Sequence, residues 1–327
     1  MKILIIRFSS IGDIVLTTPV IRCLYKQLNV EIHYITKSSF RGILEQNPYI
    51  TKVWSIEKRV SEVSAKLRQE RFDYIIDLHK NLRSFQLKVL FRCPSFSFDK
   101  LNFQKWLLVK LHINILPTVH IVDRYMQAVA PLGVHNDQQG LDYFISENDI
   151  QNAQQIIDNQ NITNNNFIAF AIGAAHATKR LPDNQIIAIC KKICIPVVLL
   201  GGKEDAQRGE LIATQTGTYV INLCGQLSLN LSAAMVALCQ KIITHDTGLM
   251  HIAAALRKPI ISIWGSTVPA FGMYPYLPNG EPFQIIEVQK LSCRPCSKIG
   301  YDVCPKGHFK CMNEIAADEV AGAATLL

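Results

Sequence analysis

Short apolar runs typical of buried strands alternate with helical stretches along this chain, and the alternation occurs twice. In the first half, such runs cover residues 2–7, 31–36, 53–56 and 74–77. Helical patterning covers residues 14–28, 60–71, 82–90, 103–111 and 121–130. Strands and helices that alternate at this spacing predict a parallel, doubly wound α/β sheet.

A second alternation follows a polar stretch, rich in Asn and Gln, between residues 133 and 166. A helix is expected inside it at residues 147–158, and we place a domain boundary near residue 160. Further strands are expected at residues 167–172, 196–200, 241–244 and 259–264, and helices at residues 183–193, 204–213, 229–239 and 248–256. Two successive α/β sheets of similar size predict a cleft that faces the carboxyl ends of both sets of strands.

Length and composition agree with two folded domains. The chain has 327 residues, of which 49% are hydrophobic and 18% charged, and this excludes a disordered chain. The first apolar run ends at Arg7, too early for a signal peptide, and no stretch of about 18 uncharged apolar residues could span a membrane. We therefore expect a cytoplasmic protein in which most of the ten cysteines are reduced.

The first strand leads into a turn that contains Gly12 and Asp13. A single glycine does not make the dinucleotide-binding fingerprint, which needs three. Asp13 stands where a helix begins, so one interpretation is a helix cap. The other is a carboxylate at the end of the first strand that acts as a general base.

The strand at residues 241–244 leads into a second informative turn. Free backbone N–H groups of Thr247, Gly248 and Leu249 at a helix start would bind phosphate, and glycine would let a ligand approach closely. Asp246 could cap this helix or hold a hydroxyl group. An ordinary strand–turn–helix connection is the equal alternative. His251 lies one helical turn further on, where a packed side chain and a functional one both remain open.

Two loops carry charged residues next to the expected cleft. Lys179 and Arg180 follow the strand at residues 167–172 and could neutralise a diphosphate leaving group, or could form a solvated basic pair. Glu204 and Asp205 follow the strand at residues 196–200. Either carboxylate could accept hydrogen bonds from ribose hydroxyls, or could cap the next helix.

Five segments resemble, in sequence and in order, motifs of the ADP-heptose:lipopolysaccharide heptosyltransferases, which form glycosyltransferase family nine. They are FSSIGDIVLTTP (8–19), KRLP (179–182), GG (201–202), DTGLMH (246–251) and IWGSTVP (263–269). The resemblance implies a GT-B fold of two Rossmann-like, doubly wound parallel-sheet domains that face a cleft. Residues 1–160 would form the acceptor-binding domain and residues 161–327 the nucleotide-sugar donor-binding domain. Whether the last helix packs back on the N-terminal domain is left open.

The same resemblance implies an inverting, metal-independent transfer of heptose, or a related sugar, from an ADP-sugar to a lipopolysaccharide core acceptor. Asp13 would be the general base, and Lys179 would steady the diphosphate of the leaving ADP. Either Glu204 or Asp205 would hold the ribose, and Leu227 would lie near the adenine. The implied donor site comprises Ser10, Gly12, Glu204, Asp205, Leu227, Asp246, Thr247, Gly248, Leu249 and His251.

The implied partners are an ADP-sugar donor and a phosphorylated glycolipid acceptor, with no cofactor, no nucleic acid and a monomeric protein. Ala174 and Ala175 stand where relatives often carry hydroxyls, so phosphate contacts from that loop do not carry over. Two alternatives remain, a nucleotide-sugar epimerase of the same architecture and a non-catalytic nucleotide-sugar-binding protein. Asp13 and Lys179 argue against the second.

Four late cysteines have the spacing C-x2-C-x7-C-x6-C: Cys293, Cys296, Cys304 and Cys311. Four thiols in 19 residues match a structural zinc site in number, but the second half lacks a C-x2-C pair. Reduced thiols and a disulfide are the alternatives. No metal ion is expected in the active site itself.

The net charge of +8 is concentrated in one part of the chain. Residues 52–112 hold 13 Lys and Arg against six Asp and Glu, an excess of seven. Arg59, Arg68 and Arg83 are the candidate acceptor-binding residues. Solvated helix faces would explain the excess equally well. The alternative is a peripheral surface for a phosphorylated acceptor at the anionic cytoplasmic face of the inner membrane. The sequence contains no basic stripe interleaved with aromatic residues, so this pattern gives no support for a nucleic-acid partner.

Overall fold

Residues 1–326 of the chain, as described by a computed structural model, form two α/β units. The first unit comprises Met1–Leu101 and Val119–Phe144. The second comprises Asn102–Thr118 and the chain from Ile145 onward. These bounds differ from the expected ranges 1–160 and 161–327 in two places: Asn102–Thr118 belongs to the second unit, and so does the helix at Glu147–Asn159.

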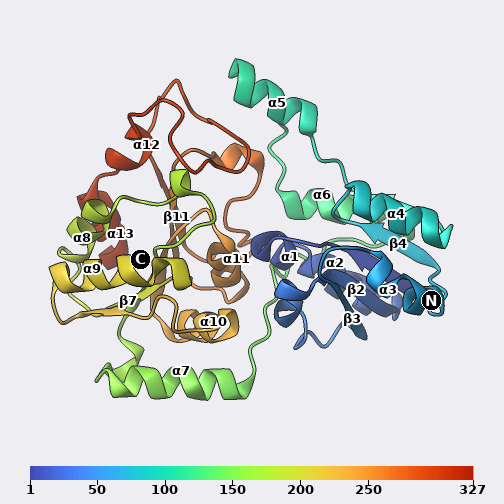
Figure 1. Ribbon diagram of the computed structural model, residues 1–327, viewed down its shortest axis with the longest axis horizontal. Coiled ribbons are helices and arrows are strands. Elements are labelled where there is room, and N and C mark those ends of the chain that lie inside the picture. The colour runs from blue at the N-terminus through green and yellow to red at the C-terminus, as the bar shows by residue number, and fades with distance from the viewer. Residues whose placement is uncertain (327) are drawn as a thin grey trace. The chain divides into compact units, whose positions relative to one another are not determined.

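The first unit follows the expected alternation closely (Figure 1). Its strands are β1 (Lys2–Ile6), β2 (Glu31–Lys37), β3 (Lys52–Ile56), β4 (Tyr74–Asp77) and β5 (Ser95–Ser97). Its helices are α1 (Ile11–Val15), α2 (Thr18–Leu28), α3 (Ser61–Arg68), α4 (Leu82–Phe91) and α6 (Ile121–Gln127), with 3-10 turns η1 (Ser38–Ile43) and η2 (Ala130–Leu132).

The second unit contains six strands, β6 (Ile168–Ala171), β7 (Val197–Leu200), β8 (Val220–Asn222), β9 (Lys241–His245), β10 (Ile260–Trp264) and β11 (Phe283–Glu287). Its helices are α5 (Asn102–Leu111), α7 (Glu147–Asn159), α8 (Asp183–Cys190), α9 (Ala206–Thr216), α10 (Leu229–Leu238), α11 (Gly248–Ala255), α12 (Lys310–Asn313) and α13 (Ala317–Leu326). Its 3-10 turns are η3 (Thr163–Asn165), η4 (Ala177–Lys179), η5 (Lys203–Asp205) and η6 (Pro269–Phe271).

Both sheets are parallel and doubly wound. The first has the strand order β3-β2-β1-β4-β5, and the second β11-β10-β9-β6-β7-β8. The strand order reverses between β1 and β4 in the first sheet, and between β6 and β9 in the second. In an open α/β sheet, the loops at the carboxyl ends of such a pair of strands line the ligand-binding crevice. The loops that follow β1, β4, β6 and β9 are therefore the places to look for a site.

Each sheet is covered by its own apolar core. The first core includes Leu4, Ile6, Ile35 and Ile75, and the second is built around β6, β7, β9 and β10. The central strands are buried on both faces, since Ile3–Ile6 of β1 are fully buried. This burial explains why they are continuous apolar runs in the sequence. The last helix, α13, packs against α8, β10 and β11 of its own unit.

The expected helix at residues 14–28 is two helices, and this expectation was wrong. α1 ends at Val15 and α2 begins at Thr18, with Pro19 in its first turn. Proline has no backbone N–H to continue the preceding helix, but it fits the start of a new one. The hydroxyls of Thr17 and Thr18 donate to the carbonyls of Ile14 and Val15, at 2.6 and 2.7 Å.

Candidate active site

Asp13 lies in the third position of α1, just beyond the carboxyl end of β1. Its carboxylate accepts hydrogen bonds from the backbone N–H and the hydroxyl of Ser10, at 3.2 and 2.9 Å. The turn that places Ser10 and Gly12 ahead of Asp13 therefore fixes the carboxylate on the helix start. Ser10, rather than Asp13, is the N-cap residue, and Asp13 contributes to the cap by accepting from the Ser10 N–H. This contact orients the same side chain that the other interpretation makes a base.

A buried arginine holds the other oxygen of Asp13. The Arg7 guanidinium lies 2.7 Å from Asp13 Oδ1, and Arg7 is only 8% exposed. It also donates to the carbonyls of Leu78 and Ser9, at 2.6 and 2.7 Å, and to the Tyr125 hydroxyl, at 3.0 Å. These bonds fix the Arg7 side chain independently of its ion pair with Asp13. No motif in the sequence singled out Arg7, although it follows β1 and so lies at the edge where a site was expected.

The charges around Asp13 keep it ionised. Burial opposes the charged form, but the Arg7 guanidinium and the Ser10 hydrogen bonds outweigh it, so the pKa of Asp13 lies below its ordinary value. Nearby, burial and the charges of Arg7 and Lys100 lower the pKa of His79 to about 4. His79 is therefore neutral at physiological pH. At this pH Asp13 is a carboxylate that can accept a proton.

In the second unit, Lys179 and Asp246 form an ion pair. Lys179 Nζ lies 2.5 Å from Asp246 Oδ2 and 3.3 Å from the Asp246 carbonyl oxygen. The Thr267 hydroxyl donates to the same carboxylate oxygen at 2.8 Å. The three residues follow β6, β9 and β10, which are neighbours in the sheet. Strand order therefore brings together residues that lie far apart in the chain, and Thr267 joins two residues that the sequence analysis had selected.

The loop that carries Lys179 is held by hydroxyl groups from other loops. The buried Thr178 hydroxyl donates to the Tyr301 carbonyl at 3.0 Å and accepts from the Tyr301 N–H at 2.8 Å and the Ser266 hydroxyl at 2.9 Å. Gly265 lies against this loop so closely that a Cβ there would stand 2.8 Å from the Thr178 carbonyl oxygen. The loop is thus positioned before any ligand arrives.

The turn into α11 is half-buried. Thr247, Gly248 and Leu249 are partly exposed there, and the Thr247 hydroxyl lies 3.3 Å from that of Thr244. The first N–H groups of a helix have no acceptor within it and carry the positive end of its dipole. By contrast, His251 is 2% exposed inside α11, which is the position of a packed side chain.

Leu227, which the resemblance places near the adenine, lies in the turn between β8 and α10. It is half-buried there, so part of its side chain is accessible to a ligand.

Glu204 and Asp205 have different surroundings. Asp205 is 1% exposed, and its carboxylate accepts from the Gly202 N–H at 3.0 Å and lies 3.6 Å from an Arg180 nitrogen. Glu204 is exposed beside Gly202. Of the two, Asp205 fixes the turn, and Glu204 is the accessible carboxylate.

The three candidate acceptor residues lie on neighbouring elements of the first unit. Arg59 precedes α3, Arg68 ends it, and Arg83 is in the first turn of α4, which packs against α3. Arg59 and Arg68 are exposed and Arg83 is half-buried. Arg68 and Arg83 are thus on helices of this unit and Arg59 is in the segment before α3, whereas Asp13 and Arg7 lie at the carboxyl end of β1.

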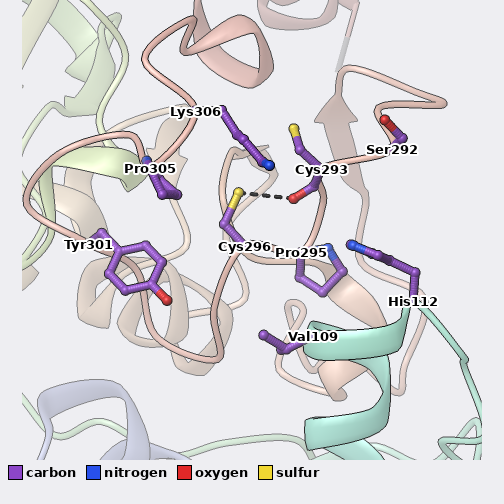
Figure 2. A pocket seen from close by; sticks show the side chains of 9 residues that line it. All are labelled: Val109, His112, Ser292, Cys293, Pro295, Cys296, Tyr301, Pro305 and Lys306. Carbon is purple, nitrogen blue, oxygen red and sulfur yellow. Dashed lines mark hydrogen bonds between the residues drawn. The ribbon is translucent and has the colours of Figure 1, made fainter.

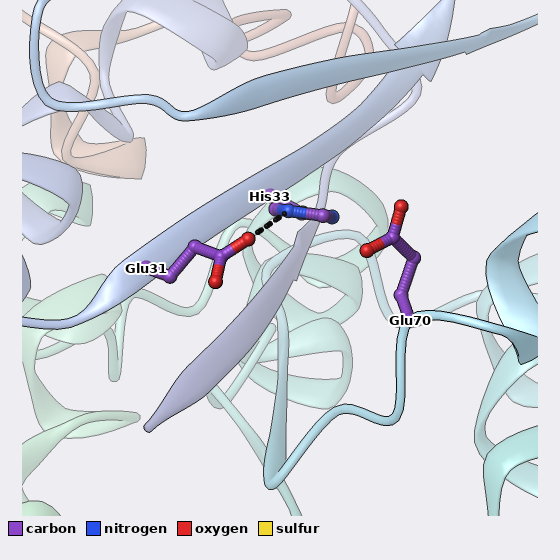
Figure 3. Close-up of side chains that lie close together, drawn as sticks. All are labelled: Glu31, His33 and Glu70. Atoms are coloured by element: carbon purple, nitrogen blue, oxygen red, sulfur yellow. Dashed lines mark hydrogen bonds and ion pairs between the residues drawn. The ribbon is translucent and has the colours of Figure 1, made fainter.

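In the described part of the chain, one set of side chains lies close enough together to bind a metal ion, but lysines already pair with its carboxylates. Glu31, His33 and Glu70 place one ligand atom each within 4.8 Å of the others (Figure 3). Lys2 lies 3.1 Å from Glu31 and 2.9 Å from Glu70, and Lys52 lies 2.8 Å from Glu70. Hydrogen bonds from these lysines lower the pKa of Glu70 to about 2. The arrangement is an ion-pair network that a metal would have to displace.

The four late cysteines border a different region of the second unit. All are free thiols, and within residues 1–326 no three of their sulfurs lie within metal-ligand spacing. Cys293 and Cys296 line a cavity of about 270 Å³ together with Lys306 and the end of α5 (Figure 2). Burial and the neighbouring thiols raise the pKa of Cys296 to about 11, and burial raises that of Cys311 to about 12. Both are therefore protonated at neutral pH.

Within residues 1–326, none of the helices is both long enough and apolar enough to pass through a lipid bilayer.

Comparison with known proteins gives a consistent result. The sequence profile of glycosyltransferase family 9 (heptosyltransferase) matches residues 60–303. Lipopolysaccharide heptosyltransferase 1 of Campylobacter coli is 25% identical, over 82% of this chain and 84% of its own length. Lipopolysaccharide heptosyltransferase 2 of Escherichia coli K12 is also 25% identical, over 83% of this chain and 84% of its own length.

Solved structures agree at the level of the fold. The family 9 glycosyltransferase from Veillonella parvula superimposes with a TM-score of 0.81 at 24% identity, covering 99% of this chain and 96% of its own. The E. coli heptosyltransferase WaaC with ADP gives a TM-score of 0.64 at 23% identity, covering 82% of this chain and 89% of its own.

Proposed function

The chain belongs to glycosyltransferase family 9, the heptosyltransferases, and on that premise we propose that it moves heptose from an ADP-sugar to a lipopolysaccharide core acceptor, with inversion and without a metal ion. Relatives that align with more than four-fifths of this chain carry the name lipopolysaccharide heptosyltransferase, which supports the transferred sugar and the acceptor class. The ADP donor is supported by the WaaC structure that contains ADP.

Asp13 is the general base of the proposed reaction. Its carboxylate removes the proton of the acceptor hydroxyl while that oxygen attacks the anomeric carbon. The new C–O bond forms as the bond from the anomeric carbon to the phosphate oxygen breaks, and the electron pair leaves with ADP. One displacement from the opposite face inverts the anomeric centre. The carboxylate that Arg7 and Ser10 hold in its ionised form supplies the proton acceptor.

The donor diphosphate binds, in this proposal, at the carboxyl edge of the second sheet. The observation that carries the proposal is the position of Lys179, a cation held beside Asp246 next to the start of α11. An ammonium group and the positive end of a helix can together stabilise the charge that develops on ADP. Thr247–Leu249 would cradle phosphate, and exposed Glu204 would hold the ribose.

The acceptor is proposed to bind to the first unit while the enzyme works at the cytoplasmic face of the inner membrane. Arg59, Arg68 and Arg83 supply a basic surface for a phosphorylated glycolipid. We propose a monomer and no bound cofactor.

A calorimetric binding screen with ADP, UDP and GDP tests the donor class. ADP is expected to bind most tightly, and tighter binding of UDP or GDP would reject the proposed donor. Transfer from ADP-heptose is expected to survive EDTA, and restoration of lost activity by a divalent cation would reject the metal-independent mechanism.

The same protein preparations also test the two alternative functions that the sequence left open, an epimerase and a binding protein. An epimerase would convert ADP-heptose without any acceptor, whereas a binding protein would leave the donor unchanged when the acceptor is added. The proposed transferase is expected to release ADP in proportion to acceptor consumed.

A further inference from the structure

Exposed apolar side chains are concentrated in one short part of the chain. Among residues 1–326, sixteen large apolar side chains are exposed, and eight of them lie between residues 82 and 115. The same part of the sequence is strongly basic: residues 78–122 hold seven Lys and Arg and one acidic residue, Asp99. Exposed apolar groups among basic residues indicate a partner that has both apolar and anionic groups.

The densest part is α5 with the four residues that follow it, Asn102–Ile115, here called the α5 segment. Phe103 is 66% exposed and Trp106 47% exposed, and their rings stack with centroids 6.3 Å apart and 16° between planes. The segment continues with Leu111, Ile113 and Ile115, each at least half exposed. All these side chains are on the surface, although burying them would be favourable.

The opposite side of the α5 segment is attached to its own unit. Leu108 is 7% exposed, and Val109 and His112 line the cavity that Cys293 and Cys296 border (Figure 2). Lys298 also donates to the Asn102 carbonyl at 3.3 Å. The helix is thus held by one face, and the face with the aromatic pair is left uncovered.

Charge distinguishes between the possible occupants of this face. Residues 100–122 contain no Asp or Glu, and Lys105 and Lys110 flank Trp106 in the sequence. The cores of protein–protein interfaces are depleted in lysine. Tryptophan at the boundary between lipid headgroups and acyl chains, beside lysines that face anionic headgroups, is instead the composition of helices that lie in a membrane surface.

We propose that the α5 segment binds an anionic phospholipid bilayer, with Phe103, Trp106 and the aliphatic residues at the acyl boundary and the exposed Lys110 among the headgroups. The inference rests on the proposed function, since a membrane-borne acceptor is what makes such an attachment useful. The lipid contact itself needs neither donor nor acceptor.

Trp106 is the natural reporter for the test. The other two tryptophans, Trp54 and Trp264, are 7% and 1% exposed, so they add a constant signal. Vesicles of phosphatidylglycerol and phosphatidylethanolamine, without glycolipid, are added to the full-length protein. A blue shift of the fluorescence and quenching by brominated acyl chains are expected, with binding that weakens as salt rises.

Two triple variants locate the contact. F103S/W106S/I113S lacks the Trp106 reporter, so its binding is measured by cosedimentation with the vesicles, and its partition coefficient is expected to fall by about tenfold or more. L82S/F85S/V89S, which removes the exposed apolar face of α4, is the matched control and is expected to bind vesicles as the original chain does. Both variants change only exposed residues, and unchanged thermal unfolding and ADP affinity verify that each is folded.

Four outcomes would overturn the inference. The first is unaltered vesicle binding by the α5 variant, and the second is loss of binding in the α4 variant alone. The third is a dimer in sedimentation that the α5 variant converts to monomers, because a second copy of the chain would then cover this face. Absence of vesicle binding in a chain that still binds ADP and transfers heptose would reject this inference and leave the proposed function intact.

Discussion

Asp13 shows how one residue can be a helix cap and a candidate base at the same time. The Ser10 hydrogen bonds and the Arg7 guanidinium orient its carboxylate and hold its pKa below the ordinary value. A low pKa makes the carboxylate a weaker base, but it guarantees the unprotonated form at neutral pH. Because the acceptor hydroxyl becomes acidic only as it attacks, a weak and fully ionised base suffices.

Replacing Asp13 with Asn tests this role. The amide keeps the size of the side chain and can still accept from Ser10, but it cannot take up a proton. Turnover is expected to fall by about 10²–10⁴-fold while ADP affinity changes little. Initial rates and ADP calorimetry on the same preparation measure both quantities. Full activity in the variant would remove Asp13 as the base.

Arg7 is expected to set the acidic limb of the pH profile. In the natural chain, kcat/KM should stay level until the pH falls to the lowered pKa of Asp13. In Arg7→Met only the Ser10 hydrogen bonds still oppose the effect of burial on Asp13, so its pKa rises and activity is lost at higher pH. The midpoint of the acidic limb should move upward by about 1–3 units.

Arg7→Lys is the companion variant, because it retains the charge and should retain most of the low midpoint. Unfolding curves across the same pH range separate loss of activity from loss of structure. An unshifted limb in folded Arg7→Met would show that Arg7 does not control Asp13.

Lys179 is paired with Asp246, so a ligand phosphate must compete for it or join the pair. Lys179→Ala is expected to weaken ADP binding by about tenfold or more, since a hydrogen bond to a charged group is lost. Calorimetry with ADP and with adenosine distinguishes the diphosphate contribution, because adenosine affinity should not change. Equal losses for both ligands would contradict the assignment.

At the scale of elements, loops rather than helices or strands decide the geometry around Lys179. Gly265, just after β10, leaves just enough room for the loop that carries Thr178 and Lys179. A Cβ at this position would approach the flexible end of Met312, which can move, and the Thr178 carbonyl oxygen, which belongs to the backbone. A rotamer change alone therefore cannot accommodate a side chain here.

Gly265→Ala is expected to move this loop. The unfolding free energy should fall by about 1–3 kcal/mol, and ADP binding should weaken although no ligand-binding group has been removed. Gly322→Ala, where a Cβ would meet nothing within 4 Å, is the matched control and should be neutral or slightly stabilising. Thermal unfolding and ADP calorimetry on both variants provide the comparison, and unaltered values for Gly265→Ala would show that the loop adapts.

At the scale of the whole molecule, the GT-B fold class expected from the sequence is confirmed, as two doubly wound parallel α/β units. The excess positive charge belongs almost entirely to residues 52–112. Two groups of these residues have different proposed partners: Arg59, Arg68 and Arg83 for the acceptor, and the α5 segment for lipid.

Neutralising Arg59, Arg68 and Arg83 together is expected to raise the KM for a phosphorylated acceptor and to reduce its dependence on salt, while ADP binding stays unchanged. The control replaces three exposed lysines of the second unit, Lys191, Lys290 and Lys310, with glutamine, and removes the same net charge. Equal effects of the two triple variants would mean that net charge matters and the position of the arginines does not.

The sequence by itself determined the two rounds of strand and helix, because buried parallel strands are continuous apolar runs and helices repeat at 3.6 residues. It did not predict β5, β8 and β11. β5 and β8 have three residues each, and all three are edge strands with partly exposed side chains, so their patterning is weak. The break between α1 and α2 could have been found from Pro19.

In the candidate site, too, some features could be predicted from the sequence and others could not. The turns that hold Asp13, Lys179, Asp205 and Asp246 could be found in the sequence, because turn and capping chemistry is local. Thr267 lies in a segment that the family resemblance had included, but its contact with Asp246 joins loops after two different strands, so no spacing within one loop predicts it.

Only the tertiary structure decided which of these residues meet. Lys179 and Asp246 are 67 positions apart and become neighbours because β6 and β9 lie side by side at the point where the strand order reverses. In the same way, Arg7 reaches both Asp13 and Tyr125, and burial separates Asp205 and His251 from the exposed Glu204. Periodicity and turn chemistry act between residues close in the chain, whereas strand order and burial are set by packing between distant segments, which no local pattern records.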